Sequence, residues 1–129
     1  MKFIAVYAAA CLFLNRSEAR PDVSQYPEDK QKRLIADHDL ETILEANNMI
    51  ANNGKPWKAN LADTNEWKYY PGFRVIPDHS APAGFRLAFH GCGNADSYAF
   101  LGARHACKTE ELARFMGNNC PELYKYTLS

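Results

Sequence analysis

The longest regular pattern of apolar and polar positions in the chain starts at Glu28. Apolar residues recur there at spacings of three, four and six, with charged residues mostly between them, which is typical of a helix with one buried face. These apolar positions are Ala36, Leu40, Ile43, Leu44 and Ile50. We expect the helix to begin at Glu28, or at a cap on Asp39, and to end within residues 47–53. Gly54 suits a left-handed C-cap, and Pro56 prevents continuation.

Two short runs rich in aromatic and β-branched residues follow, at 73–76 and 85–90. The residues between them include Pro77, Pro82 and Gly84, and this connection is too long for a tight two-residue turn. We therefore predict two antiparallel strands joined by a loop. The preceding stretch, 57–70, carries two Trp and two Tyr without a clean period. We expect it to line the core, with a strand or short helix near its end.

The last third of the chain predicts two helices. Asn94 or Asp96 caps the first, which runs to about Ala106. Thr109, followed by two glutamates, caps the second, which ends at Gly117. The fold class is therefore α+β, with an N-terminal amphipathic helix, a short antiparallel sheet and a C-terminal helical hairpin that carries one disulfide.

The N-terminus carries the pattern of a secretory signal peptide. Lys2 precedes an apolar run over residues 3–14, and a polar stretch with small residues at Ser17 and Ala19 follows. We predict that residues 1–19 are a signal peptide cleaved after Ala19, and that the protein is secreted and extracellular. The alternative is a buried N-terminal helix, which the run's lack of an amphipathic period disfavours.

These boundaries leave a flexible arm at 20–27 and a single small secreted domain at 28–129. No other stretch approaches the roughly 20 apolar residues of a membrane span, so none is expected after cleavage. Fifteen basic and fifteen acidic residues balance, which excludes the basic face that nucleic acid requires. A partner protein is the better expectation.

Removal of Cys11 with the signal leaves three cysteines in an oxidising compartment. If the two C-terminal helices fold back as a hairpin, Cys92 and Cys120 lie at its open end, and Cys107 lies at the bend about 15 Å away. A disulfide tolerates a Cα separation of only about 4.4–6.8 Å. We therefore favour a Cys92–Cys120 disulfide, with Cys107 free or linking a homodimer. Pairings of Cys107 with either partner stay open.

The same region offers a second chemistry, because His90, Cys92, His105 and Cys107 repeat a His-x-Cys unit. Two histidines and two cysteines suit a tetrahedral zinc site. Secretion favours oxidation over metal binding, so we expect no cofactor, with zinc as the alternative.

A small hydrolase is another alternative, for which paired histidines act as general acid and base in the manner of a ribonuclease. The candidates for such chemistry are Ser97, His79, His90, His105, Asp78, Asp96 and Cys107. No motif selects among them, so the catalytic residues are not assigned and an enzyme is the less expected class.

One set of positions follows the spacing of a helical pattern: Glu28, Lys32, Ala36, Asp39, Ile43 and Asn47. This spacing resembles the propeptides of papain-like cysteine proteases, with type matches at Glu28, Ile43 and Asn47. Ser97 stands where the nucleophilic cysteine of such a precursor belongs, and the chain ends before the distant His and Asn. The resemblance therefore implies a propeptide-like inhibitor rather than a protease.

The favoured function is that of a small extracellular interaction protein of the effector, toxin or venom type, with a role in virulence through binding of a host or partner protein. Aromatic side chains supply large contact areas in such interfaces. The candidate contacts are Trp57, Trp67, Tyr69 and Tyr70. The alternative is that these four side chains pack in the hydrophobic core of the protein.

Overall fold

The computed structural model describes residues 2–60, 62–63, 65–81, 84–95 and 105–128. Its elements are, in chain order, helix α1 (Tyr7–Phe13), helix α2 (Glu28–Ala51), strand β1 (Lys68–Pro77), strand β2 (Phe85–Ala95), helix α3 (Glu110–Asn119) and helix α4 (Pro121–Leu128). The α+β class is confirmed, since helices and an antiparallel pair of strands make up the described residues.

Helix α2 has the bounds and the termination that its pattern predicted. It starts at Glu28, and the backbone N–H of Gly54 donates to the carbonyl of Met49 over 2.8 Å. Gly54 has a φ of +84°, the left-handed conformation that glycine adopts without a steric penalty. Leu40, Ile43 and Leu44 on its inner face are 0–2% exposed. The periodic apolar positions therefore do form one buried face.

Strands β1 and β2 form the predicted antiparallel pair; β1 extends beyond its apolar run at both ends, and β2 extends beyond its run at the C-terminal end. The register shifts between Pro71 and Phe73. A Cβ at Gly72 would lie 3.2 Å from the carbonyl oxygen of Gly91, so the strands approach closely at this irregularity. Asn94 pairs with Tyr69 inside the sheet, so its predicted role as a helix cap is wrong.

Thr109 caps helix α3 as predicted, because its side chain accepts from the backbone N–H of Leu112 over 3.1 Å. The helix runs two residues beyond the predicted end at Gly117. The preceding helix, predicted up to Ala106, falls mostly on residues 96–104, which lie outside the described part of the chain. Helix α4 follows α3 directly, in a part of the chain for which the pattern predicted no helix. Proline at its first position is favourable because that position needs no N–H donor.

The predicted Cys92–Cys120 disulfide is wrong, and the four cysteines are all free thiols. Cys92, on β2, lies beside the first residue of α3, with its Sγ 3.8 Å from the carbonyl oxygen of Glu110. Cys120 follows the last residue of the same helix. Ten helical residues separate these ends by about 15 Å, well beyond the reach of a disulfide.

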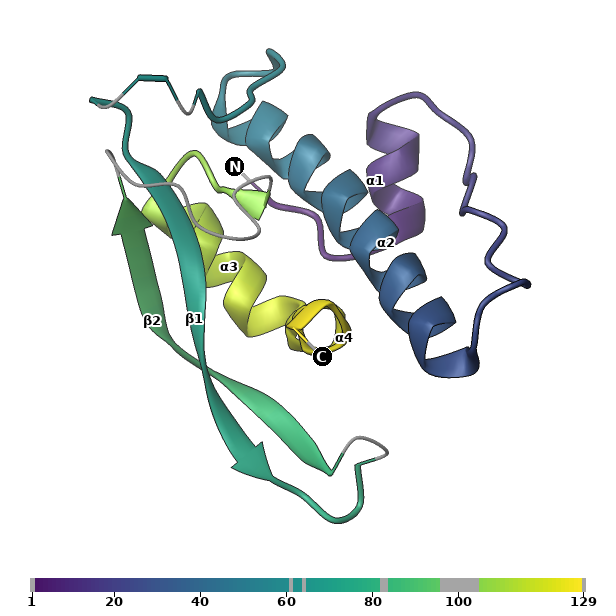
Figure 1. Ribbon diagram of the computed structural model, residues 1–129. Coiled ribbons are helices and arrows are strands. Elements are labelled where there is room, and N and C mark those ends of the chain that lie inside the picture. Colours follow the sequence, from purple (N-terminus) through teal and green to yellow (C-terminus); the bar gives the residue numbers. More distant parts are fainter. Residues whose placement is uncertain (1, 61, 64, 82–83, 96–104, 129) are drawn as a thin grey trace.

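The N-terminal residues lie inside the fold rather than outside it. The stretch from residue 2 to residue 6 passes beside α2 before it enters α1, which packs against α2 (Figure 1). Phe3 stacks on Phe115 of α3 with 5.4 Å between ring centroids, and the Cys120 thiol faces the carbonyl of Ala5 at 3.8 Å. The two-stranded sheet covers the other side of α3 and α4. The core therefore joins the first residues of the chain to the last.

Within the described residues, none of the helices has the length and apolar character needed to cross a membrane.

Candidate functional site

A cleft of about 760 Å³ lies between α2 and the segment that follows it. Its wall combines apolar, basic and acidic side chains on α2, on the N-terminal segment and on the segment after α2. Among them are Arg16, His38, Glu41, Glu45, Trp57 and Lys58. Concave sites with a few polar groups are the usual location of ligand binding, so this cleft is the first candidate.

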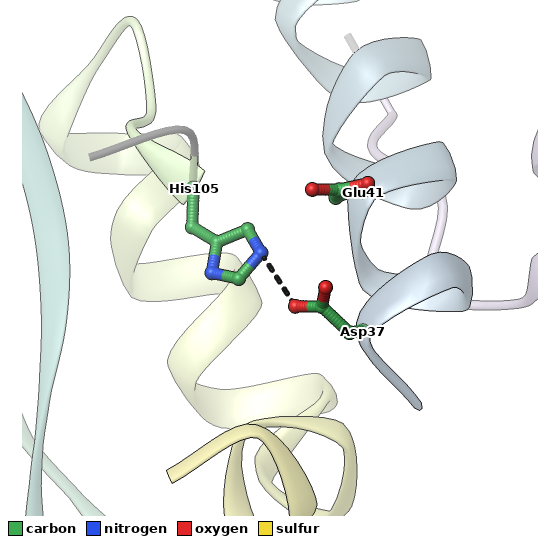
Figure 2. A group of neighbouring side chains, drawn as sticks. All are labelled: Asp37, Glu41 and His105. Carbon is green, nitrogen blue, oxygen red and sulfur yellow. Dashed lines mark ion pairs between the residues drawn. The ribbon is translucent and has the colours of Figure 1, made fainter. Parts of the chain in front are cut away.

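One edge of the cleft carries a cluster of Asp37, Glu41 and His105, drawn in Figure 2. Asp37 and Glu41 are four residues apart on α2, which places both carboxylates on one helix face. His105 reaches them from the segment before α3, with its Nε2 3.1 Å from Oδ1 of Asp37. One ligand atom from each residue lies within 4.8 Å of the other two. Glu41 also lines the cleft, so the cluster adjoins the cleft through this residue.

The segment that carries His105 is held from two sides. The amide of Asn48 on α2 donates to the carbonyl of Ala106 over 3.0 Å and accepts from the N–H of Lys108 over 2.8 Å. On the other side, the backbone of Cys107 exchanges two hydrogen bonds with Tyr69 of β1, of 2.8 and 3.1 Å. These bonds fix the backbone directly after His105, and His105 itself is 6% exposed. The imidazole is therefore preorganised against the two carboxylates.

A second histidine lines the cleft. His38 neighbours Asp37 on α2, and its Nε2 is hydrogen-bonded to the hydroxyl of Tyr7 over 3.0 Å. The Tyr7 hydroxyl also accepts from the N–H of Ala19 over 3.1 Å. Burial is the largest cause of a raised pKa for Tyr7, so this phenol stays protonated through the neutral range. The N-terminal segment thus takes part in shaping the cleft.

The donor set determines what the cluster can hold. Imidazole and carboxylate groups together suit zinc, manganese and iron among the divalent cations. Ligands about 2.0–2.1 Å from one such ion, at tetrahedral or octahedral angles, lie roughly 3 Å apart. The 3.1 Å between His105 and Asp37 matches that spacing, and Glu41 lies on the solvent-exposed side from which it can close on an ion. Three protein ligands leave further positions open to water or a bound partner.

The zinc set predicted from the His-x-Cys units is not brought together as a group in the described residues. His90 is exposed on β2, whereas Cys107 is fully buried. Burial raises the pKa of the Cys107 thiol well above its ordinary value. A bridge from Cys107 to a second copy therefore requires the fold to open locally, and the disulfide-linked homodimer stays a prediction. Of the four residues, His105 alone belongs to the cluster of Figure 2.

The four aromatic contact candidates lie in different surroundings. Trp57 lines the cleft, and Trp67 is 50% exposed just before β1. Tyr69 and Tyr70 are half-buried on β1, and burial raises the pKa of Tyr70. Only Trp57 therefore combines an aromatic surface with a place in the candidate site.

Of the hydrolase candidates, Asp96 and Ser97 lie outside the described residues. His79 is exposed in the loop between the strands. Asp78, in the same loop, accepts from the hydroxyl and the N–H of Ser80, which lowers its pKa. His105 is the hydrolase candidate that the structure places against an acid, Asp37.

Sequence reasoning missed Asp37 and Glu41. Their spacing of four along a predicted helix was the available indication, since it places them on one face. The same spacing is common among solvent-exposed pairs, so the partner His105, 64 and 68 positions away, was needed to identify the cluster.

The positions that resemble a protease propeptide all lie on α2, from Glu28 to Asn47. Ile43 and Asn47 are 1% and 0% exposed and serve the protein's own core. An inhibitory role therefore stays a prediction.

Comparisons with protein-family models, with curated proteins and with solved structures find no match to this chain.

Proposed function

We propose that the protein is a small binding protein that holds a divalent cation at Asp37, Glu41 and His105 and receives a segment of a partner protein in the adjoining cleft. The observation that carries this proposal is the convergence of three ligand atoms within 4.8 Å at the edge of that cleft. Secretion and an effector-like role stay predictions from the sequence.

The cleft supports a peptide-like occupant by its chemistry. Arg16 and Lys58 supply positive charge, Glu41 and Glu45 supply negative charge, and Trp57 adds an aromatic surface. Arg16 and Glu45 already pair across 2.6 Å at exposed positions, where an ion pair contributes little and is easily exchanged. A partner segment of mixed charge can replace that pair with its own contacts.

Metal binding is testable through the fluorescence of Trp57, which lines the cleft. A Trp67→Phe background leaves Trp57 as the single tryptophan. Titration with Mn²⁺ or Zn²⁺ should give a saturable change with one site per chain. Glu41→Gln removes one ligand from a solvent-exposed position and should weaken binding about tenfold or more.

Glu45→Gln is the matched control, one helical turn further along α2 and on the same cleft wall. It should leave the metal affinity unchanged within about twofold, because Glu45 is not part of the cluster. Equal affinities for Glu41→Gln and the parent would refute the metal site. As the second arm, an array of mixed-charge peptides should bind the metal-loaded protein and lose binding in Trp57→Ala or with a chelator.

A second function is favoured by the contact between His105 and Asp37. An imidazole held by a carboxylate at 3.1 Å is the arrangement of a general base, and His38 borders the same cleft. In a hydrolase of this kind, cleavage of an RNA dinucleotide or an activated ester should persist in a chelator. Asp37→Asn should slow it about a hundredfold, because it leaves His105 unoriented. Activity abolished by the chelator would instead support the metal site.

A further inference from the structure

We infer that the folded protein keeps residues 1–19, so the segment with the secretory pattern is a structural element whenever the chain folds. The inference does not rest on the metal site or the cleft, although Arg16 of this segment lines the cleft. It rests on the packing of side chains from residues 3–14 against the core, on the hydrogen bonds that hold Ile4, Ala19 and Arg20, and on what the removal of residues 1–19 would expose.

The first observation is the bond between Asn47 and Ile4. The side chain of Asn47 accepts from the N–H of Ile4 and donates to its carbonyl, over 2.7 Å each. Asn47 is 0% exposed. A buried amide without partners is costly, and a cleaved chain would leave this side chain without both backbone partners. The weaker contact of its Nδ2 with Sδ of Met116, over 3.4 Å, would be the one that remains.

The second observation is that α1 has a buried face and an exposed face. Tyr7, Ala10 and Cys11 are 0–6% exposed and belong to the main core cluster, whereas Leu12 is 83% exposed. On the partner side, Leu40 and Ile43 of α2 are 0% and 1% exposed in the same cluster. The apolar run therefore packs like an amphipathic helix, with one face buried against α2.

The third observation concerns the predicted cleavage point itself. The N–H of Ala19 donates to the hydroxyl of Tyr7 over 3.1 Å. The next residue, Arg20, donates twice to the carboxylate of Asp39 over 3.0 Å each, and its guanidinium lies 4.4 Å from the centre of the Tyr7 ring. Asp39 is 7% exposed and the Arg20 side chain is 47% exposed, so the bidentate pair ties a half-exposed guanidinium to a buried carboxylate. The Ala19–Arg20 bond is thus flanked on both sides by contacts that the fold uses.

The consequence is a competition between folding and processing. A chain that has folded holds one face of the apolar run against the core, so a translocation machinery or a signal peptidase would have to pull α1 away from α2 to engage it. A chain that has lost residues 1–19 lacks one wall of that core. The two fates therefore exclude each other for any one molecule.

The test compares the full chain with a chain that starts at Arg20. The full chain should unfold cooperatively on heating, and the shorter chain should show no cooperative transition, because its core is open on one side. Addition of a synthetic peptide of residues 1–19 should restore the transition. The same peptide with Ala10→Asp should not, because Ala10 is fully buried. A shorter chain with the Tm of the full chain, or a parent peptide that restores nothing, would overturn the inference.

The direction in which one substitution changes Tm supplies a second test. If residues 1–19 stay, Asn47→Leu leaves the N–H and carbonyl of Ile4 without partners, and Tm should fall by roughly 5–10 °C. If they are removed, the Asn47 amide has already lost both backbone partners and keeps only its 3.4 Å contact with Sδ of Met116, so the same change breaks no bond to the N-terminal segment and Tm should rise or stay the same. Asn118→Leu, at an exposed position of α3, is the control and should change Tm little. A rise in Tm for Asn47→Leu would refute retention.

Discussion

Two adjacent asparagines on α2 hold two distant parts of the chain. Asn47 binds the backbone of Ile4, and Asn48 binds the backbone on both sides of Cys107. Consecutive helical residues point about 100° apart, so each amide serves a different side of the helix. Both are at most 5% exposed, and both satisfy donor and acceptor groups that would otherwise be buried without partners. Asparagine suits this task because its amide carries one acceptor and two donor hydrogens.

At the same scale, the cysteines predict a pattern of chemical reactivity. With four free thiols, a denatured sample should consume four equivalents of a thiol reagent such as DTNB. In the native protein near pH 8 only Cys92, which is half-buried, should react quickly. Cys11, Cys107 and Cys120 are at most 4% exposed, and burial raises the pKa of Cys120 to about 11. Since the thiolate is the reactive form, these three should react only as the fold opens.

Cys92→Ser is the control for that experiment, and it should abolish the fast phase while leaving the slow phases unchanged. Fewer than four reactive thiols in the denatured, unreduced chain would show that a disulfide exists after all.

Among the elements, the contact of α3 with the sheet depends on a glycine. A Cβ at Gly117 would overlap the ring of Phe89 and lie 3.0 Å from Cβ of Pro71. Glycine in a helix costs about 1 kcal/mol relative to alanine, so at an open position Gly117→Ala would stabilise the protein. Here the overlap outweighs that gain, and the substitution should lower the free energy of unfolding by about 1–3 kcal/mol.

Urea denaturation measures this effect. Asn118→Ala, the next residue of the same helix, is exposed and gains helix propensity without a clash, so it should be neutral or slightly stabilising. Equal stabilisation by both substitutions would show that α3 does not pack on β1 and β2 as described.

For the whole molecule, the sequence predicted what local patterns determine. Helix α2 with Gly54, the strand pair and the Thr109 cap all follow from residues close to one another in the chain. The position of the N-terminal segment was harder to predict. A short apolar run after Lys2 fits the pattern of a signal peptide and also that of a buried helix. Its place depends on Asn47, a contact 43 residues away.

The candidate site was also difficult to predict from the sequence. Trp57 and His105 were among the candidates from the sequence, but Asp37 and Glu41 look like solvent-exposed residues of an amphipathic helix until His105 is placed beside them. The disulfide was mispredicted for a related reason. Cys92 and Cys120 were assigned to the open end of a helical hairpin, and the fold instead separates them by the length of α3.

The first residues lie between α2 and the C-terminal helices, and this position determines the order in which their contacts can form during synthesis. Ala5 meets Cys120 across 115 positions of sequence, and Phe3 meets Phe115. Phe3 and Ala5 must wait for residues 115–120 before these contacts can form, whereas the partners of Ile4 and α1 on α2 are synthesised earlier. Contacts of such long range make folding slow. Until these contacts form, the sides of Phe3 and Ala5 that meet the C-terminal helices are uncovered, so the last step of folding joins the two ends of the chain.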